Sequence, residues 1–394
     1  MITAATPWYE TAIDLWNHNF PRVLKKMHEK HGPIVRVSPW ELHIYDPDYF
    51  NNVFVTSAKR RTTIEPREGL LMDSFAGDII GELACGKNPQ LMNGQDFTPE
   101  WQVPDKLLRI DLFPGVDELI PIKLLKALSP KTASFSIMAV LGVTQIEKIK
   151  KEVALQAKDQ AEESQSVFHS LLRSDMPPAE LSDMRLSADA MALLAAGTAT
   201  TSSVLTLISF YIISEPRIRN RLRDELGVAM AGVPPGKLLQ WTQLEKIPYL
   251  NACIKEGVRI GRTFRRNGRI SPDQELQYKG YTIPKNTLVS MSLSLQHVDP
   301  AVFPEPNRFR PERWLGEYDP RMDDYMQPFS KGSRDCLGKN LARAELYIAI
   351  GTLFRPGGPR LTISGCDESD IFPVNDKEWG VPKTDSRGLS VCVG

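Results

Sequence analysis

The stretch Phe329–Gly338, F-S-K-G-S-R-D-C-L-G, decides the fold of this chain of 394 residues. It places Cys336 where a loop with two glycines enters a long helix, which we expect over 337–354. Backbone N–H groups and the dipole at a helix start favour an anion, so the Cys336 thiol can ionise there. Gly332 permits a tight turn, and Gly338 leaves a bare surface on which a flat ligand can lie.

Arg334 stands two residues before this cysteine and can hold a carboxylate through two parallel hydrogen bonds. A thiolate, a flat surface and a carboxylate clamp together describe a haem with a cysteine axial ligand. A lone cysteine is by default a buried structural residue, but the full ten-residue pattern favours haem. Zinc is disfavoured, because no second cysteine or histidine lies nearby in the sequence.

This pattern resembles F-x-x-G-x-R-x-C-x-G, the haem-binding signature of the cytochrome P-450 family of haem-thiolate monooxygenases. All five specified positions match, namely Phe329, Gly332, Arg334, Cys336 and Gly338. The resemblance implies haem b with Cys336 as the iron ligand, and a mainly α fold with small β-sheets (α+β). It also implies a single domain over 1–394. That domain would have β-rich parts at 33–56 and 265–290, an oxygen-binding helix at 186–214, and the haem-cysteine loop at 329–338.

Two further motifs follow the family order. Glu256 and Arg259 are three residues apart on an expected helix and can pair. Alone they would be a surface salt bridge worth at most about 0.5 kcal/mol. The segment Phe309–Trp314, F-R-P-E-R-W, resembles the family's P-E-R loop. That resemblance implies that Arg313 joins the other two residues in a buried structural network.

The expected helix at 186–214 contains A-G-T-A-T-T at Ala196–Thr201, which resembles the family's oxygen-binding motif, A-G-x-(D/E)-T-T. The resemblance implies a catalytic role for Thr200 in proton delivery, with Gly197 letting the helix open where oxygen sits. A Ser/Thr-rich helix bonding to its own carbonyls is the plain alternative. Position 199 is Ala199, where the family usually has Asp or Glu, so the proton relay differs here.

The same helix needs weighing as a membrane span. Ala190–Ser214 is uncharged for 25 residues, long enough to cross a bilayer. Eight of these residues are Ser or Thr, and five of them cluster near its middle. We therefore interpret the segment as a long buried helix of a soluble protein.

The resemblance extends less securely to other positions. Arg269 and His297 stand where family members place groups that bind the haem propionates, although each could be an ordinary polar residue. Lys331, Lys339 and Arg343 flank the cysteine loop. A basic rim there would steer an acidic flavoprotein, but solvated cations are the plain interpretation.

Composition sets the remaining limits. Lys+Arg and Asp+Glu both number 48, so the formal charge is zero, which argues against a nucleic-acid partner held by a general basic field. Five cysteines without a C-x-x-C pair indicate a reduced, intracellular compartment. We find no secretory signal and no transmembrane anchor, so peripheral contact with the endoplasmic reticulum is the expectation by resemblance.

The pattern of apolar residues and breakers predicts the other elements. We expect helices at 21–31, 70–84, 145–163, 248–259 and from 216 onward, a hairpin at 34–45, β structure at 277–290, and an extended segment at 299–314. Between the first β region and the expected helix at 70–84 stand only Thr56–Met72, where the family normally has several helices. A segment on the substrate side is therefore missing.

The sequence thus predicts a monomeric haem-dependent monooxygenase of fungal secondary metabolism. It would insert one atom of O2 into an apolar small molecule, with electrons from an NADPH-dependent reductase. Two alternatives stay open. Ala199 suggests a haem-thiolate isomerase or dehydratase, and the missing segment suggests a catalytically inactive, truncated paralogue.

Overall fold

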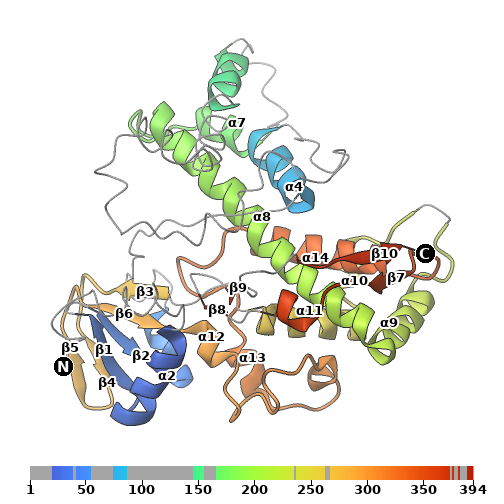
Figure 1. The fold of residues 1–394 in the computed structure, drawn as a ribbon. Coiled ribbons are helices and arrows are strands. Elements are labelled where there is room, and N and C mark those ends of the chain that lie inside the picture. Colours follow the sequence, from blue (N-terminus) through green and yellow to red (C-terminus); the bar gives the residue numbers. More distant parts are fainter. Residues whose placement is uncertain are drawn as a thin grey trace. The chain divides into compact units, whose positions relative to one another are not determined.

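The structure is a computed structural model. It describes residues 20–38, 41–54, 74–86, 145–154, 166–234, 237–261, 267–372, 375–376, 380–381 and 388–393. The chain forms two compact units, one of Met1–Arg67 with Ser203–Gly394 and one of Glu68–Ser202 (Figure 1). We describe each unit by itself, and the expectation of a single domain over 1–394 stays a prediction.

A four-stranded sheet forms the β part of the first unit. Its strands, in sheet order, are β1 (Ile34–Ser38), β2 (Glu41–Ile44), β6 (Leu288–Met291) and β3 (Asn267–Ile270). β1 and β2 form the predicted antiparallel hairpin, β2 pairs with β6 in parallel, and β3 returns antiparallel to β6. This last pairing sets Arg269, on the edge strand β3, opposite Val289 on β6.

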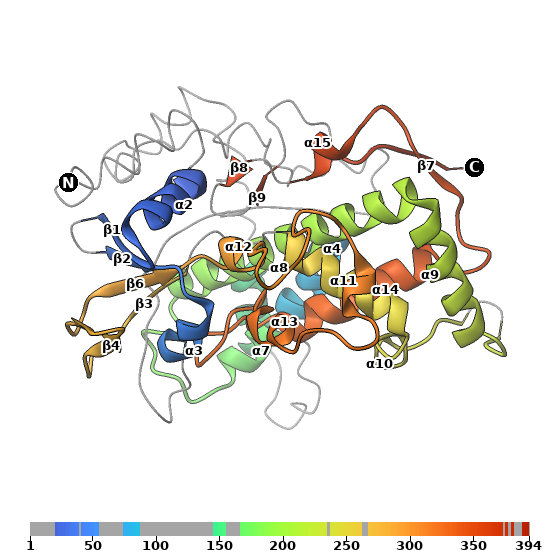
Figure 2. The ribbon, with the colours of Figure 1, turned by 90° about the horizontal axis from the view of Figure 1, so that it is seen from below.

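Short elements surround this sheet (Figure 2). They are α2 (Phe20–His31), η2 (Pro47–Tyr49), α3 (Phe50–Val53), and the hairpin of β4 (Leu276–Tyr278) and β5 (Tyr281–Ile283). Lys279 and Gly280 both have positive φ at the tip of the hairpin, at the predicted turn. The β-rich assignment of 33–56 was wrong for 47–53. There Pro47 opens a helical turn, and Phe50 and Phe54 stack into the core.

Long helices form the rest of the first unit. They are the part of α8 (Asp183–Ser214) from Ser203 onward, then α9 (Pro216–Ala229), α11 (Pro248–Ile260) and α14 (Lys339–Leu353) with the short α10 (Trp241–Leu244). Proline in the first turn starts α9 and α11, where its missing N–H costs nothing. The apolar side of α9, with Ile218, Leu222 and Leu226, lies in the largest buried cluster, as its four-residue spacing predicted.

The remaining elements of this unit are short. They are α12 (Leu293–Gln296), η5 (Pro311–Trp314), α13 (Arg321–Tyr325), β7 (Leu361–Ile363), α15 (Glu368–Ile371), β8 (Asn375–Asp376), β9 (Gly380–Val381) and β10 (Val391–Val393). The segment 299–314 was predicted as extended, but it forms a series of turns and ends in the 3-10 helix η5. The helix after the cysteine loop begins at Lys339, two residues later than expected.

The second unit is built on the part of α8 up to Ser202. Around it are α4 (Ser74–Cys85), α7 (Val167–Leu172) and a helix over 145–154. Ile146, Phe168 and Leu186 are central to its buried cluster. The stretch Thr56–Met72, where the family segment is missing, and residues 155–163 of the expected charged helix lie outside the described residues.

Within the described residues, α8 is the one helix long and apolar enough to cross a membrane by length and composition. Half of its most apolar window, 50%, is buried inside the protein. Core helices of soluble proteins pass the same test of length and composition. The partial burial of α8 is compatible with the interpretation of 190–214 as a buried helix.

Close packing of α11 on α8 gives a first testable prediction. A Cβ added at Gly257 would lie 2.1 Å from Cγ1 of Ile208, so Gly257→Ala should force this fully buried side chain to move. We expect the free energy of unfolding to fall by about 1–3 kcal/mol in a denaturant titration. The control Gly227→Ala, on the outer helix α9, meets only Pro356 at 3.3 Å and should not destabilise the protein. Equal behaviour of the two variants would contradict the packing argument.

Candidate functional site

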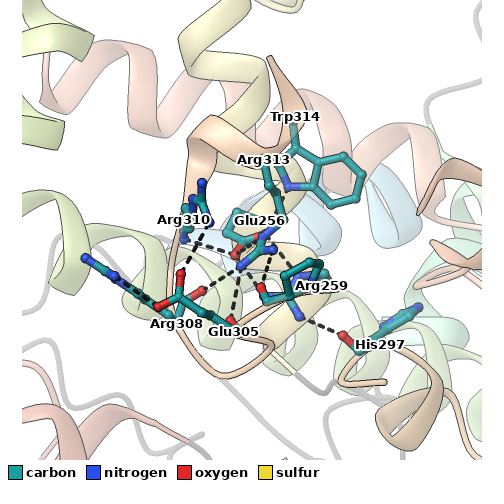
Figure 3. Close-up of polar contacts among 9 residues, drawn as sticks. Glu256, Arg259, His297, Glu305, Arg308, Arg310, Arg313 and Trp314 are labelled. Carbon is teal, nitrogen blue, oxygen red and sulfur yellow. Dashed lines mark hydrogen bonds and ion pairs between the residues drawn. The ribbon is translucent and has the colours of Figure 1, made fainter. Parts of the chain in front are cut away.

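A buried carboxylate organises the first unit near its centre (Figure 3). Oε1 of Glu256 accepts hydrogen bonds from Arg259 Nη2 at 2.8 Å, from Arg313 Nε at 2.9 Å and from the backbone N–H of Arg310 at 3.0 Å. Oε2 accepts from Arg259 Nε at 3.0 Å and from the indole N–H of Trp314 at 2.9 Å. The structure thus joins Glu256, Arg259 and Arg313, as the resemblance implied, and adds Trp314.

Backbone carbonyls take up the other donors of the two arginines. Arg259 donates Nη1 to the carbonyl of His297 at 2.6 Å, and Arg313 donates Nη1 to the carbonyl of Pro304 at 2.7 Å. Glu256 and Arg259 are fully buried and Arg313 nearly so. One carboxylate faces two guanidinium groups, and carbonyl dipoles stabilise the second positive charge. The network therefore fixes α11, the chain after α12 and η5 against one another.

The cysteine loop follows this network in the chain. The N–H of Cys336 donates to the carbonyl of Phe329 at 2.9 Å, which closes the loop between the first residue of the motif and its cysteine. Gly332 has φ +89° and Ser330 has φ +61°, so the turn uses the left-handed region twice. Gly338 is the N-cap of α14, and a Cβ there would meet no atom within 4 Å. The face of the loop at Gly338 is therefore open.

Electrostatics at Cys336 differ from the sequence expectation. The thiol is exposed at the surface, yet its pKa lies above its usual value, mainly because the surrounding chain removes water from the thiolate. The N–H of Gly338 lowers the pKa, Asp335 raises it and Lys339 lowers it. Desolvation thus disfavours the Cys336 thiolate more than the N–H groups at the helix start favour it. A bound metal ion would oppose this shift, since a metal ion lowers the pKa of a coordinating thiol.

A buried cation lies beside the same loop. Arg269 on β3 is 2% exposed and packs 4.5 Å from the ring centroid of Phe54. In the described residues its acceptors are neutral: Ser330 Oγ at 3.2 Å and the carbonyls of Gly268 and Arg334. Burial, and then the positive charge of Arg334, lower the pKa of Arg269 to about 10. Two guanidinium groups near each other with neutral acceptors for the buried one form a site that suits an anion.

His297 lies between the buried Glu256 network and the chain that leads to the cysteine loop. Its Nε2 accepts the N–H of Gln327 at 3.1 Å, and its carbonyl accepts from Arg259. Burial, and then the charge of Arg259, lower the pKa of His297 to about 3, so the ring is neutral. This residue connects the buried network to the chain that enters the cysteine loop. Its role as a propionate ligand stays a prediction.

The motif on α8 lies in the second unit. Thr200 donates its hydroxyl to the carbonyl of Ala196 at 2.8 Å, and Thr198 does the same to Leu194 at 2.7 Å. Both therefore bond to their own helix, and Thr200 keeps acceptor capacity on its oxygen. Gly197 lies against α4, where a Cβ would come within 2.8 Å of Ile80 Cγ1. Close helix packing thus requires this glycine, whatever part it takes in oxygen binding.

The cations flanking the loop have partners. Lys339 pairs with Asp335 at 2.6 Å, Arg343 pairs with Glu245 at 3.5 Å, and Lys331 donates to Oδ1 of Asn51 at 2.6 Å. Two of the three charges are thus matched by carboxylates. A basic rim for an electron donor is weaker than the sequence alone suggested.

The family model for cytochrome P450 matches residues 65–356 of the chain. The chain belongs to the cytochrome P450 family. The predicted family and the mainly α fold with small sheets are confirmed. Cytochrome P450 enzymes generally hold haem on a cysteine thiolate, and the monooxygenases among them generally use O2 and a reductase.

The relatives are fungal P450 monooxygenases. The chain is 39% identical to the cytochrome P450 monooxygenase sdnH of Sordaria araneosa, with 100% of this chain and 89% of the relative covered. It is 32% identical to the monooxygenase vrcB of Aspergillus aculeatus, with 100% and 93% covered, and 32% identical to fusicoccadiene C-8 hydroxylase of Phomopsis amygdali, with 100% and 90% covered. The monooxygenase class and the link to fungal secondary metabolism are confirmed. Fungal relatives of this kind are generally membrane-associated enzymes of the endoplasmic reticulum.

The comparison also bears on the missing segment. The alignment with the Sordaria relative runs over 487 positions, whereas the chain has 394 residues, a difference of 93 positions. Those positions have no residue of this P450 opposite them. This agrees with the expectation that a piece of the family fold is absent, while Thr56–Met72, the expected place of the gap, lies outside the described residues.

Sequence reasoning missed three contributors to the site. Trp314 donates to the buried carboxylate, although the motif F-R-P-E-R-W already placed an indole next to Arg313. The N–H of Arg310 also serves Glu256, which only backbone geometry could show. Ser330 accepts from Arg269, and no spacing rule links residues 61 positions apart.

The network gives the second prediction. Glu256→Gln should remove the negative charge between two buried arginines and lower the free energy of unfolding by about 3–5 kcal/mol. The control Glu305→Gln changes a carboxylate that is 52% exposed and pairs with Arg308 and Arg310 at the surface, so it should cost less than about 1 kcal/mol. Denaturant unfolding of the two variants measures the difference. A small loss for Glu256→Gln would show that the carbonyl contacts alone hold the arginines.

Proposed function

We propose that this P450 is a single haem-thiolate domain over 1–394 that inserts one atom of O2 into an apolar small molecule of fungal secondary metabolism. The observation that carries the proposal is the cysteine loop. An exposed thiol, an open glycine face and a buried arginine with neutral acceptors stand on one short loop and the strand beside it.

The residues present fit a haem b. Cys336 would ligate the iron, and Phe329, Gly332 and Gly338 would shape the loop around it. Arg269 and Arg334 supply the positive charge that two propionate groups need, and the neutral acceptors of Arg269 leave that charge to be matched by an anion. The raised pKa of the Cys336 thiol agrees with a ligand that ionises when a metal ion binds.

When bound, the haem supplies O2 activation with electrons from an NADPH-dependent reductase. Cys336 would hold the haem iron through its thiolate, and the network around Glu256 holds the chain that leads into its loop. Thr200 is the residue on α8 that would move a proton, by turning its hydroxyl from the carbonyl of Ala196 to water. Ala199 is buried and carries no acid, so protons must reach Thr200 through water or substrate.

The substrate class follows from the relatives. One of them is named a fusicoccadiene C-8 hydroxylase and another a stellatic acid synthase, which indicates oxidation of an apolar carbon skeleton. We propose a substrate of that kind for this chain. We further propose that it acts as a monomer, with no nucleic-acid partner, and lies peripherally on the endoplasmic reticulum.

A haem-thiolate isomerase or dehydratase is the second candidate. It is favoured by Ala199, which removes the usual acid, and by the hydroxyl of Thr200, which bonds to its own helix. Such an enzyme rearranges or dehydrates its substrate without NADPH. Product formed without reductase and NADPH would replace the monooxygenase proposal by this one.

The third prediction tests the cysteine. Reduced wild-type protein under carbon monoxide should show the strongly red-shifted Soret band of thiolate-ligated haem, and Cys336→Ala should abolish it. The control Cys392→Ala removes another exposed cysteine and should leave the band unchanged. A haem-free wild-type protein would show that the missing positions are needed for haem capture and would sink the proposal.

The fourth prediction tests the threonine. Thr200→Ala should lower the product formed per NADPH consumed by about tenfold or more, because a positioned proton donor is lost. Thr198→Ala removes the same kind of side-chain bond to the helix backbone, two residues earlier, and serves as a matched control. Equal coupling in both variants would mean that the Thr200 hydroxyl only donates to the carbonyl of Ala196.

A further inference from the structure

Two buried histidines stand apart from the cysteine loop, between the first helix and the sheet. Nε2 of His28 on α2 lies 2.7 Å from Nδ1 of His43 on β2, and Nε2 of His43 lies 2.8 Å from Oγ of Ser292, which follows β6. Nδ1 of His28 lies 2.9 Å from the carbonyl of Gly32. The exposed fractions of the two rings are 6% and 0%. Figures 1 and 2 both show α2 lying beside β2.

The positions of the hydrogens in this series of hydrogen bonds follow from its first member, the carbonyl of Gly32. A carbonyl can only accept, so Nδ1 of His28 carries a hydrogen, and Nε2 of a neutral His28 must accept. Nδ1 of His43 then donates to His28, and Nε2 of a neutral His43 accepts from the hydroxyl of Ser292. Each bond in the chain is satisfied by one arrangement of two neutral rings.

Protons disturb this arrangement in two steps. A first proton can be accommodated if the Ser292 hydroxyl turns from donor to acceptor, but it places a charge in a buried position. A second proton sets an N–H of His28 against an N–H of His43, where the nitrogens are 2.7 Å apart. Two like charges at that separation repel each other strongly in a poorly hydrated site.

The titratable groups around the pair come from several elements. The ring of Tyr45 lies 5.6 Å from that of His28, and its hydroxyl donates to Asp299 at 3.2 Å. Glu41 is buried two residues before His43 on β2, and alternation along a strand puts both on one face. On β1, Val35 stands opposite His43, and the neighbouring Arg36 is exposed. Glu41 can stabilise one proton on the pair, but it does not relieve the contact of two protonated rings.

The hydrogen bonds through His28, His43 and Ser292 join elements that are far apart in sequence. His28 lies in the helix before the sheet, His43 lies inside the sheet, and Ser292 is the residue before α12. β6 is the strand that pairs with β3 and carries Val289 opposite Arg269. The histidine pair therefore connects the first helix to the strand next to the cationic site.

We propose that His28, His43 and Ser292 form an acid-sensitive latch, which holds α2 on the sheet while both rings are neutral and releases it when both are protonated. Burial lowers the pKa of His28 below its ordinary value of 6.5, with the carbonyl of Gly32 opposing this change. A base with a lowered pKa binds its proton more weakly in the folded than in the unfolded chain. The latch thus stabilises the fold fully above about pH 6.5, and this contribution is lost as the pH falls below that value.

The fifth prediction tests the latch through its pH profile. We would measure the unfolding equilibrium constant of the full chain between pH 5.5 and 7.5 for wild type and for His28→Asn, whose amide N–H can still donate to Gly32 but cannot titrate. Loss of one titrating proton should reduce the change in this constant by up to about tenfold per pH unit. His31→Asn replaces the exposed histidine at the end of the same helix and should leave the wild-type profile unchanged.

A second measurement needs only the wild type, in case His28→Asn does not fold. Hydrogen exchange of the amides in α2 and β1, corrected for intrinsic rates, should speed up between pH 7.5 and 5.5 relative to α9. An unchanged pH profile in His28→Asn, or α2 exchange that keeps pace with α9, would overturn the latch. Neither outcome depends on haem binding or turnover.

Discussion

The carboxylate of Glu256 is the group on which the first unit of this P450 depends. Two guanidinium groups, an indole N–H and a backbone N–H converge on the two oxygens of this fully buried residue. Removal of any one donor leaves the others in place, but removal of the carboxylate leaves two cations facing each other. The network reaches the cysteine loop in one further step, because Arg259 holds the carbonyl of His297 and the ring of His297 holds the N–H of Gln327. The thiol is thus positioned by contacts that begin at Glu256.

Charge is unevenly distributed around the loop itself. Arg269 is buried and Arg334 lies close enough to lower its pKa, while the cations on the outer side of the loop are mostly matched by carboxylates. An anionic ligand would stabilise the positive charges of Arg269 and Arg334 and would do little for the cations that already pair with carboxylates. Desolvation also raises the pKa of the Cys336 thiol. The charges of Arg269 and Arg334 therefore suit a ligand that carries negative charge at its edge.

Sequence reasoning located the motifs well and their neighbours poorly. The periodic helices α9 and α11, the hairpin of β1 and β2 and the turn at Lys279 were predictable from apolar spacing, prolines and a glycine. Residues 47–53 were misassigned, because Pro47 starts a helical turn that a β reading overlooks. The raised pKa of Cys336 was also missed, since a helix start is visible in a sequence and desolvation is not. Contacts such as Arg269 to Ser330 and His28 to His43 depend on tertiary packing, which spacing along the chain does not encode.

The parallel pairing of β2 with β6 has a consequence for how the protein is made. Glu41 faces Leu288 across these strands, a separation of 247 residues along the chain. At ribosomal speeds of about 5–20 residues per second, the hairpin of β1 and β2 emerges roughly 12–50 s before its partner strand exists. During that interval one edge of β2 has no strand to pair with, and such edges invite association with other chains. Nascent copies of this P450 should thus need a chaperone most during synthesis of residues 45–288.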